Sequence, residues 1–193
     1  MIGLLKQRDS TAYGWIVLGI FTVNYSLIDI SALTIGMLLP DISAEMELSP
    51  SQQGWLSSSV IFANLMFEIP ANLWLSRYRP WRIASIAFLA GAAFTALCGL
   101  SPSFTVLLAL RLALGVSYIA CKTPRTLVIL QWIPKKRIAL ANGVLFSVID
   151  FLIGVGFVVI PLIMVAVGGW RNTLYLWSVL ILVSCIVWMI FGK

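Results

Sequence analysis

The chain has 193 residues, of which 61% are hydrophobic and only 10% charged, and its formal net charge is +6. Soluble domains contain about 45–50% apolar and about 25% charged residues, so too few polar side chains remain here to cover a water-exposed surface. This composition indicates an integral membrane protein and excludes a soluble enzyme, a nucleic-acid-binding domain and a disordered tail. The sequence has no histidine, and Cys98, Cys121 and Cys185 lie far apart in apolar runs. We therefore expect no metal centre, no cofactor and no disulfide framework.

Six apolar runs follow one another along the chain, and each is long enough to cross a bilayer as a helix. They cover residues 13–39, 51–75, 82–100, 103–131, 138–167 and 170–191. Turn-forming residues lie between the runs, among them Pro40, Pro50, Pro80, Pro134 and the pair Gly168-Gly169. We predict an all-α membrane protein in which residues 1–193 form a single bundle of six transmembrane helices.

The basic residues indicate how this bundle is oriented. Nine of the thirteen lie on one side of the expected membrane: Lys6, Arg8, Arg77, Arg79, Arg82, Lys135, Lys136, Arg137 and Lys193. The opposite side carries Arg171 together with the acidic residues Asp41, Glu45 and Glu47. The positive-inside rule then places both termini in the cytoplasm, with the bundle in a plasma or bacterial inner membrane. This placement accounts for the excess positive charge without nucleic acid.

Six ionisable side chains lie within the expected spans: Asp29, Glu68, Arg111, Lys122, Arg125 and Asp150. Each would cost about 2.5–3.5 kcal/mol at the bilayer centre, so we expect them to face one another or a water-filled cavity. All six lie on the first, second, fourth and fifth spans. Helical spacing gathers them into one polar stripe on each of these helices, which makes the third and sixth spans apolar outer supports.

Depth along the helices, counted at about 1.5 Å per residue, suggests which charges meet. Asp29 and Arg111 are expected at similar heights in the outer half. Glu68 and Lys122 are expected together in the inner half, with Asp150 near the midplane and within reach of Lys122. Two interpretations stay open at this point. The groups either form neutralising ion pairs that fix helix packing or line a pathway for a substrate or an ion.

Small residues form two ridges that would let helices approach closely. Their members recur about every fourth position: Ala87, Gly91, Thr95 and Gly99 on the third span, and Ala139, Gly143 and Ser147 on the fifth.

Several residue strings resemble those of a known family. The loop from Asn72 to Arg82 stands where that family has G-x-L-x-D-R-x-G-R-R, and it keeps the basic character although Ser76 replaces the acidic residue. Arg111-Leu-Ala-Leu-Gly115 matches the R-x-x-x-G of the family's fourth helix, and Gly169-Trp170-Arg171 resembles the GWR that opens its sixth. With the predicted topology, the chain resembles the amino-terminal six-helix half of a major facilitator superfamily transporter. The segments Glu68-Ile-Pro70-Ala-Asn72 and Trp132-Ile-Pro134 are most similar to the anion:cation symporter branch, which carries organic anions.

The resemblance implies a half-size secondary transporter that moves a small organic anion by symport with a cation. It would work as a homodimer or with a second six-helix chain. In this hypothesis the substrate-binding residues are Arg111, Lys122, Tyr118, Tyr25, Asn24, Asn64 and Asn142. Asp29 and Asp150 are the candidates for ion coupling, and Glu68, Arg125 and Arg77 are the candidates for gating or structural ion pairs.

A second hypothesis is a non-transporting structural subunit of a larger membrane complex, built on a degenerate transporter fold. The altered loop around Ser76 favours it, whereas the charged stripes weigh against it. A piece cut from a longer transporter would have the same sequence. We find no nucleophile–base pair or cofactor motif and expect no enzyme. The expected partners are membrane lipid, a small solute and a second six-helix half or a larger complex, but no nucleic acid.

Overall fold

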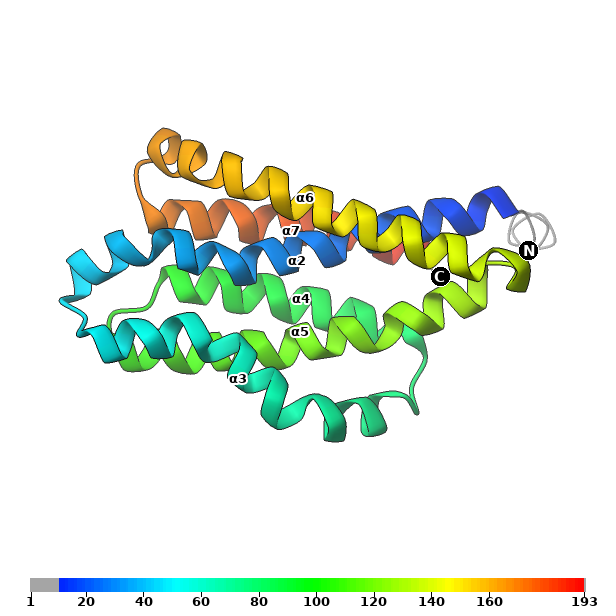
Figure 1. The fold of residues 1–193 in the computed structure, drawn as a ribbon, viewed down its shortest axis with the longest axis horizontal. Coiled ribbons are helices and arrows are strands. Elements are labelled where there is room, and N and C mark those ends of the chain that lie inside the picture. Colours follow the sequence, from blue (N-terminus) through cyan, green and yellow to red (C-terminus); the bar gives the residue numbers. More distant parts are fainter. Residues whose placement is uncertain (1–10, 193) are drawn as a thin grey trace.

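The computed structural model describes residues 11–192, which form six long α-helices and one short 3-10 helix, all running near the long axis of the molecule (Figure 1). The elements are α2 (Thr11–Met46), α3 (Pro50–Leu75), α4 (Pro80–Gly99), α5 (Phe104–Trp132), η1 (Lys135–Arg137), α6 (Ile138–Val167) and α7 (Trp170–Phe191). The start of α2 meets the end of α7, where the Tyr13 hydroxyl donates a 2.7 Å hydrogen bond to the Phe191 carbonyl. Lys6, Arg8 and Lys193, which entered the orientation prediction, lie outside the described residues.

The helix limits follow the apolar runs closely, with one exception. The limits of α6 and α7 coincide with the expected runs, and those of α3, α4 and α5 lie within two residues of them. The first helix was expected to end at Leu39, but α2 continues through Pro40 to Met46. A proline removes one hydrogen bond and disturbs one turn without having to end a helix in a membrane protein. The loop predicted between Pro40 and Pro50 is therefore only three residues long, from Glu47 to Ser49.

Local chemistry explains where two of the helices begin and end. Ser49 caps α3 in a capping box with Gln52, and Pro50 occupies the first helical turn, where its missing N–H costs nothing. At the end of α6, Gly168 and Gly169 have φ values of 79° and 124°, a region that side chains other than glycine rarely adopt. The expected glycine turn is thus confirmed.

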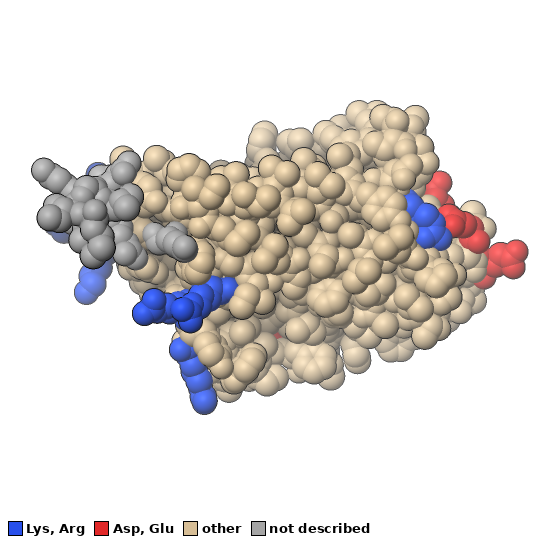
Figure 2. All heavy atoms as spheres, turned by 180° about the vertical axis from the view of Figure 1, so that it is seen from behind, with Lys and Arg blue, Asp and Glu red and all other residues tan. Residues whose placement is uncertain are grey.

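Five of the six α-helices in the described part are long and apolar enough to cross a membrane. The remaining one, α3, has 26 residues but carries two glutamines and several serines in its first half and Glu68 in its second half. The crossing of the membrane by six helices stays a prediction. Figure 2 shows that the middle of the visible surface is almost free of charged side chains, which gather at the two ends. This distribution is typical of a multi-pass membrane protein.

The helices pack around α2, α4 and α5. Helix α5 contacts both α3 and α4, while α2 contacts α5, α6 and α7, so α3 and α6 lie at opposite edges of the bundle (Figure 1). Two apolar clusters fill the interior along its length. One is centred on Phe21, Phe88 and Trp188, whose ring centroids lie 5.5–6.1 Å apart. The polar residues described below lie between α2, α3, α5 and α6.

The two predicted small-residue ridges have different surroundings. On α4 all four members are buried, with Gly91 close to Ile28 and the Thr95 hydroxyl 3.0 Å from that of Ser31. On α6, Ala139, Gly143 and Ser147 are exposed instead. The prediction that this second ridge brings two helices together is wrong within the described residues, because α6 turns a different face towards α2.

Candidate functional site

Two tyrosines join α2 and α5 in the middle of the bundle. The hydroxyls of Tyr25 and Tyr118 lie 3.1 Å apart, and the ring centroids are separated by 5.8 Å. Tyr25 is buried and Tyr118 is half-buried. Asp29 lies one helical turn beyond Tyr25, and its carboxylate interacts with the Tyr118 side chain. The polar stripes predicted on the first and fourth spans therefore meet at this point.

Lys122 follows Tyr118 by one turn and lies between an aromatic ring and a carboxylate. Its Nζ is 3.7 Å from Oε1 of Glu68 on α3 and 4.8 Å from the centroid of the Tyr118 ring. The expected meeting of Glu68 and Lys122 is confirmed. Both side chains are partly exposed, so the pair is open to exchange with another ion and contributes about 0–1 kcal/mol to stability.

Arg125 is held by aromatic rings. Its guanidinium carbon lies 4.6 Å from the centroid of Phe146 on α6 and 5.7 Å from that of Tyr25. The only ion pairs between described residues are Lys122–Glu68 and Arg171–Glu45. The prediction that Arg125 forms an ion pair is therefore wrong for the described part of the chain, and cation–π contacts take that place.

Asp29 lies near the charges of Lys122, Asp150 and Arg125, and it is half-buried whereas Asp150 is exposed on α6. We call the set the central polar cluster: Tyr25, Asp29, Glu68, Tyr118, Lys122, Arg125 and Asp150. It contains three carboxylates and two cations, on the four helices that the sequence singled out.

Arg111 lies outside the central polar cluster. It is only 2% exposed, and its terminal nitrogen donates a 3.0 Å hydrogen bond to the Ala32 carbonyl, while its Nε has no partner among the described residues. The Ala32 carbonyl lies only three residues, about one helical turn, from Asp29 on α2, so Arg111 and Asp29 lie at similar heights as expected. No ion pair joins them among the described residues, because Arg111 bonds the backbone of α2 instead of the Asp29 carboxylate.

None of the three predicted asparagines has a hydrogen bond to a cluster side chain among the described residues. Asn24 is fully buried and donates to the Ser184 carbonyl of α7, so it joins two helices. Asn142 donates to the Ile138 carbonyl of its own helix. Asn64 lies one turn before Glu68 on α3, half-buried, and its side-chain oxygen has no partner among the described residues. Arg77 is exposed in the turn after α3 and makes no ion pair within the described residues.

One contact beside the cluster was missed. The Thr123 hydroxyl donates to the side-chain oxygen of Asn72, which ties α5 to the end of α3 next to Lys122. In the sequence Asn72 entered only as part of two family-like strings, without a role of its own. Its polar side chain in an apolar segment was the available signal.

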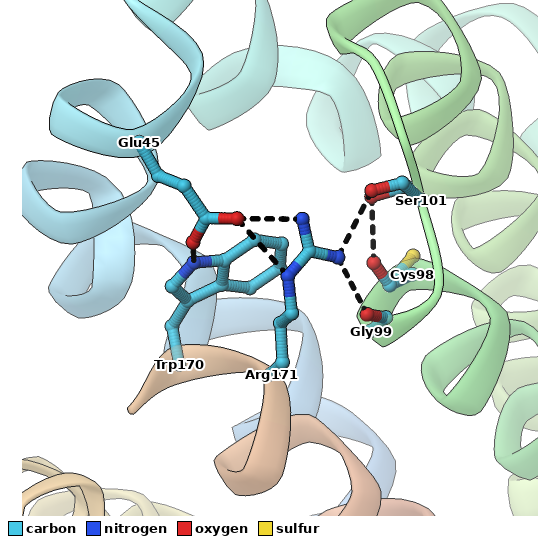
Figure 3. Close-up of polar contacts among 6 residues, drawn as sticks. All are labelled: Glu45, Cys98, Gly99, Ser101, Trp170 and Arg171. Carbon is cyan, nitrogen blue, oxygen red and sulfur yellow. Dashed lines mark hydrogen bonds and ion pairs between the residues drawn. The ribbon is translucent and has the colours of Figure 1, made fainter. Parts of the chain in front are cut away.

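A second network, also missed, closes the end of the bundle where α2 ends and α7 begins (Figure 3). The guanidinium of Arg171 donates to Oε1 of Glu45 at 2.8 and 3.2 Å and to the carbonyls of Gly99 and Ser101 at 2.8 and 3.0 Å. The Trp170 indole donates to the other oxygen of Glu45 at 2.6 Å. We call this network the end clamp. Its signal was the basic residue of Gly169-Trp170-Arg171 facing an acidic segment.

Chemically, the central polar cluster offers two cations on aromatic faces to an anion, beside carboxylates that bind a proton or metal cation. One of these cations, Lys122, is already paired with Glu68.

Comparison with known proteins agrees with this description. The Major Facilitator Superfamily profile matches residues 15–193. A protein of Cupriavidus necator described as "Probable sulfoacetate transporter SauU" is 26% identical over 171 residues, which cover 87% of this chain and 38% of that protein.

Two crystal structures of a bacterial homologue of the human lysosomal transporter Spinster share the fold. The inward-facing occupied form has a TM-score of 0.84 at 22% identity, and the unoccupied form has 0.82 at 21%. Each comparison covers 96% of this chain but only 44–45% of the other. The chain thus spans less than half the length of the relatives it matches.

Proposed function

The chain belongs to the Major Facilitator Superfamily, and we propose that its bundle is one half of a secondary transporter that moves a small organic anion together with a cation. The observation that carries the proposal is the central polar cluster. Lys122 and Arg125 present positive charge beside Tyr118 and Tyr25, in the middle of an otherwise apolar bundle. Ionisable groups at membrane depth are costly and mark substrate or ion pathways.

Lys122 is the principal contact for the anion in this proposal. Its partly exposed pair with Glu68 is long, at 3.7 Å, so a carboxylate or sulfonate of the solute replaces Glu68 at little cost. Tyr118 supports the ammonium group with its ring, and Arg125 supplies the second charge. Sulfoacetate is the first probe to test because one relative is described as a probable sulfoacetate transporter. It carries both a carboxylate and a sulfonate group.

The charges of the cluster support cation coupling. Three carboxylates and two cations leave a surplus of negative charge, and an added anion increases it. A proton or metal cation on Asp29 offsets this surplus and makes binding of the anion favourable. Asp29 lies close to Lys122 and Tyr118, so it is the first candidate for coupling. Asp150, which is exposed on α6, is the second.

The remaining part of the proposal concerns a second six-helix unit. The cluster lies between α3 and α6, and α6 exposes Asp150 together with its small-residue ridge. A second bundle placed over this face would enclose the cluster between two halves. In transporters of this kind the two halves rock against each other around the enclosed site. A second copy of the chain, or a different six-helix unit, would serve. The symporter branch, the plasma or inner membrane and cytoplasmic termini belong to the same proposal.

Uptake of labelled sulfoacetate into proteoliposomes tests the proposal, using the chain with the unit that copurifies with it and an imposed proton or sodium gradient. We expect Lys122→Gln to abolish uptake and Asp29→Asn to abolish its dependence on the gradient. Asp41→Asn is the matched control, because Asp41 is exposed at the far end of α2. Gradient-driven uptake that persists in both Asp29→Asn and Asp150→Asn would overturn the coupling role.

The alternative function, a structural subunit, rests on the replacement of the family's acidic loop residue by Ser76. Purification in mild detergent separates the two proposals. A homodimer or a complex with another six-helix unit supports transport, whereas firm attachment to an unrelated membrane complex supports the structural role.

A further inference from the structure

Six basic side chains gather at the end of the bundle opposite the end clamp, and all six are exposed. We call them the basic end: Arg77, Arg79, Arg82, Lys135, Lys136 and Arg137. The first three lie at the α3–α4 connection and the others form η1 between α5 and α6. Figure 2 shows most of the visible basic side chains at one end of the molecule and most of the visible acidic ones at the other.

These cations have no carboxylate partners within the described part of the chain. Residues 69–82 and 131–140 contain no aspartate or glutamate, and neither ion pair of the described residues involves the basic end. Orientation in the membrane requires such charges but no particular ligand. Six charges without a carboxylate partner among the described residues, on two connections at the same end of the bundle, also form a surface to which phosphate groups are attracted.

The apolar surroundings show which kind of phosphate fits. Trp74 and Tyr78 are 60% and 51% exposed, and their rings meet edge to face at 5.5 Å beside Arg77. Exposed tryptophan and tyrosine side chains are typical of the headgroup level of a membrane. Leu73 and Leu130 are also exposed, on the helices that lead into the two connections. A ligand here meets positive charge at one end and apolar side chains at the other.

We propose that the basic end binds anionic phospholipids, whose phosphates contact the two basic connections and whose acyl chains lie along the adjoining helices. A free phosphate ion would use the charges but not the exposed aromatic and leucine side chains. The bound lipids contact both the α3–α4 and the α5–α6 connections. They therefore link the end of α3 to the start of α6, the two helices that border the central polar cluster.

The test uses the full chain in nanodiscs of phosphatidylcholine with one fifth phosphatidylglycerol, and measures the anionic lipid retained after partial delipidation by native mass spectrometry. We expect enrichment of phosphatidylglycerol over its share in the bilayer. The triple variants R77Q/R79Q/R82Q and K135Q/K136Q/R137Q each lower this enrichment by at least about threefold, since each removes three surface cations. Excess inorganic phosphate leaves the enrichment unchanged.

Two controls separate this lipid contact from general effects. Asp41→Asn with Glu47→Gln, at the opposite end, keeps the enrichment, and so does the charge-preserving R77K/R79K/R82K. Size-exclusion profiles show whether each variant is folded. The proposal is overturned if the unmodified chain retains the two lipids in proportion to the bilayer. It is equally overturned if both glutamine triples keep the enrichment or if inorganic phosphate removes it.

Discussion

We expect the two charged residues of the end clamp to contribute unequally to stability, because Arg171 makes more contacts than Glu45 does. Glu45→Gln removes an ion pair at the edge of the molecule, where Arg171 and Glu45 are partly exposed, and the oxygen that glutamine keeps can still accept the Trp170 indole hydrogen bond. A pair of this kind contributes about 1 kcal/mol or less. Arg171→Gln removes the same pair and also two hydrogen bonds to the carbonyls of Gly99 and Ser101.

Those two carbonyls explain the difference in magnitude. Gly99 ends α4, and the last carbonyls of a helix have no partner within the helix. A hydrogen bond from a charged donor contributes about 1.5–3 kcal/mol, and a buried acceptor left unpaired costs about 1–3 kcal/mol. With screening at this partly exposed site, we expect Arg171→Gln to lower the free energy of unfolding by about 3 kcal/mol, against about 1 kcal/mol for Glu45→Gln.

Thermal unfolding in a mild detergent, followed by circular dichroism, measures both effects. For a chain of this length about 1 kcal/mol corresponds to about 2–4 °C in Tm, so we expect a decrease of about 3 °C for Glu45→Gln and about 6–12 °C for Arg171→Gln. Arg82→Gln is the matched control, since Arg82 is exposed and unpaired among the described residues. Equal decreases in the two clamp variants would refute the reasoning, because the carbonyl contacts would then contribute nothing.

Two further predictions concern helix packing and the cluster. A Cβ at Gly115 would lie 2.6 Å from that of Ala63, so we expect Gly115→Ala to lower stability by about 1–3 kcal/mol; Gly143→Ala, with nothing within 4 Å, serves as its control, and equal thermal shifts would contradict this. Glu68→Gln frees Lys122 without breaking the fold, so we expect Tm to change by about 2–4 °C or less and the KM for sulfoacetate uptake to fall; a higher KM would show that Glu68 assists binding.

The helix limits could be predicted wherever a turn-forming residue coincides with the end of an apolar run. Gly168 and Gly169 ended α6 as expected because their positive φ values require glycine. Pro40 was misleading, because proline restricts the backbone only locally and α2 continues beyond it. The residues after Pro40 remain helical, and Glu45 in this last part of α2 contacts Trp170 and Arg171. The hydrophobic pattern of the sequence could not predict these contacts.

The sequence predicted which helix face carries the residues of the candidate site, but not the contacts that each of them makes. The spacing of Tyr118 and Lys122 placed both on one side of α5, and the structure confirms that they lie together. Asn24 precedes Tyr25, and neighbours on a helix point about 100° apart, so only one of them could face the cluster. Helix spacing placed Arg111 near the height of Asp29, but it could not show that the guanidinium bonds the Ala32 carbonyl instead of the carboxylate.

The modest hydropathy of α3 has a consequence for how the chain is made. Its glutamines, serines and Glu68 reduce the free energy that α3 gains from entering lipid, and only Glu47–Ser49 connect it to α2. We therefore expect the two to enter the bilayer as one hairpin during synthesis. Because α3 packs chiefly against α5, which is synthesised later, α3 reaches its final position only after α5 has been inserted.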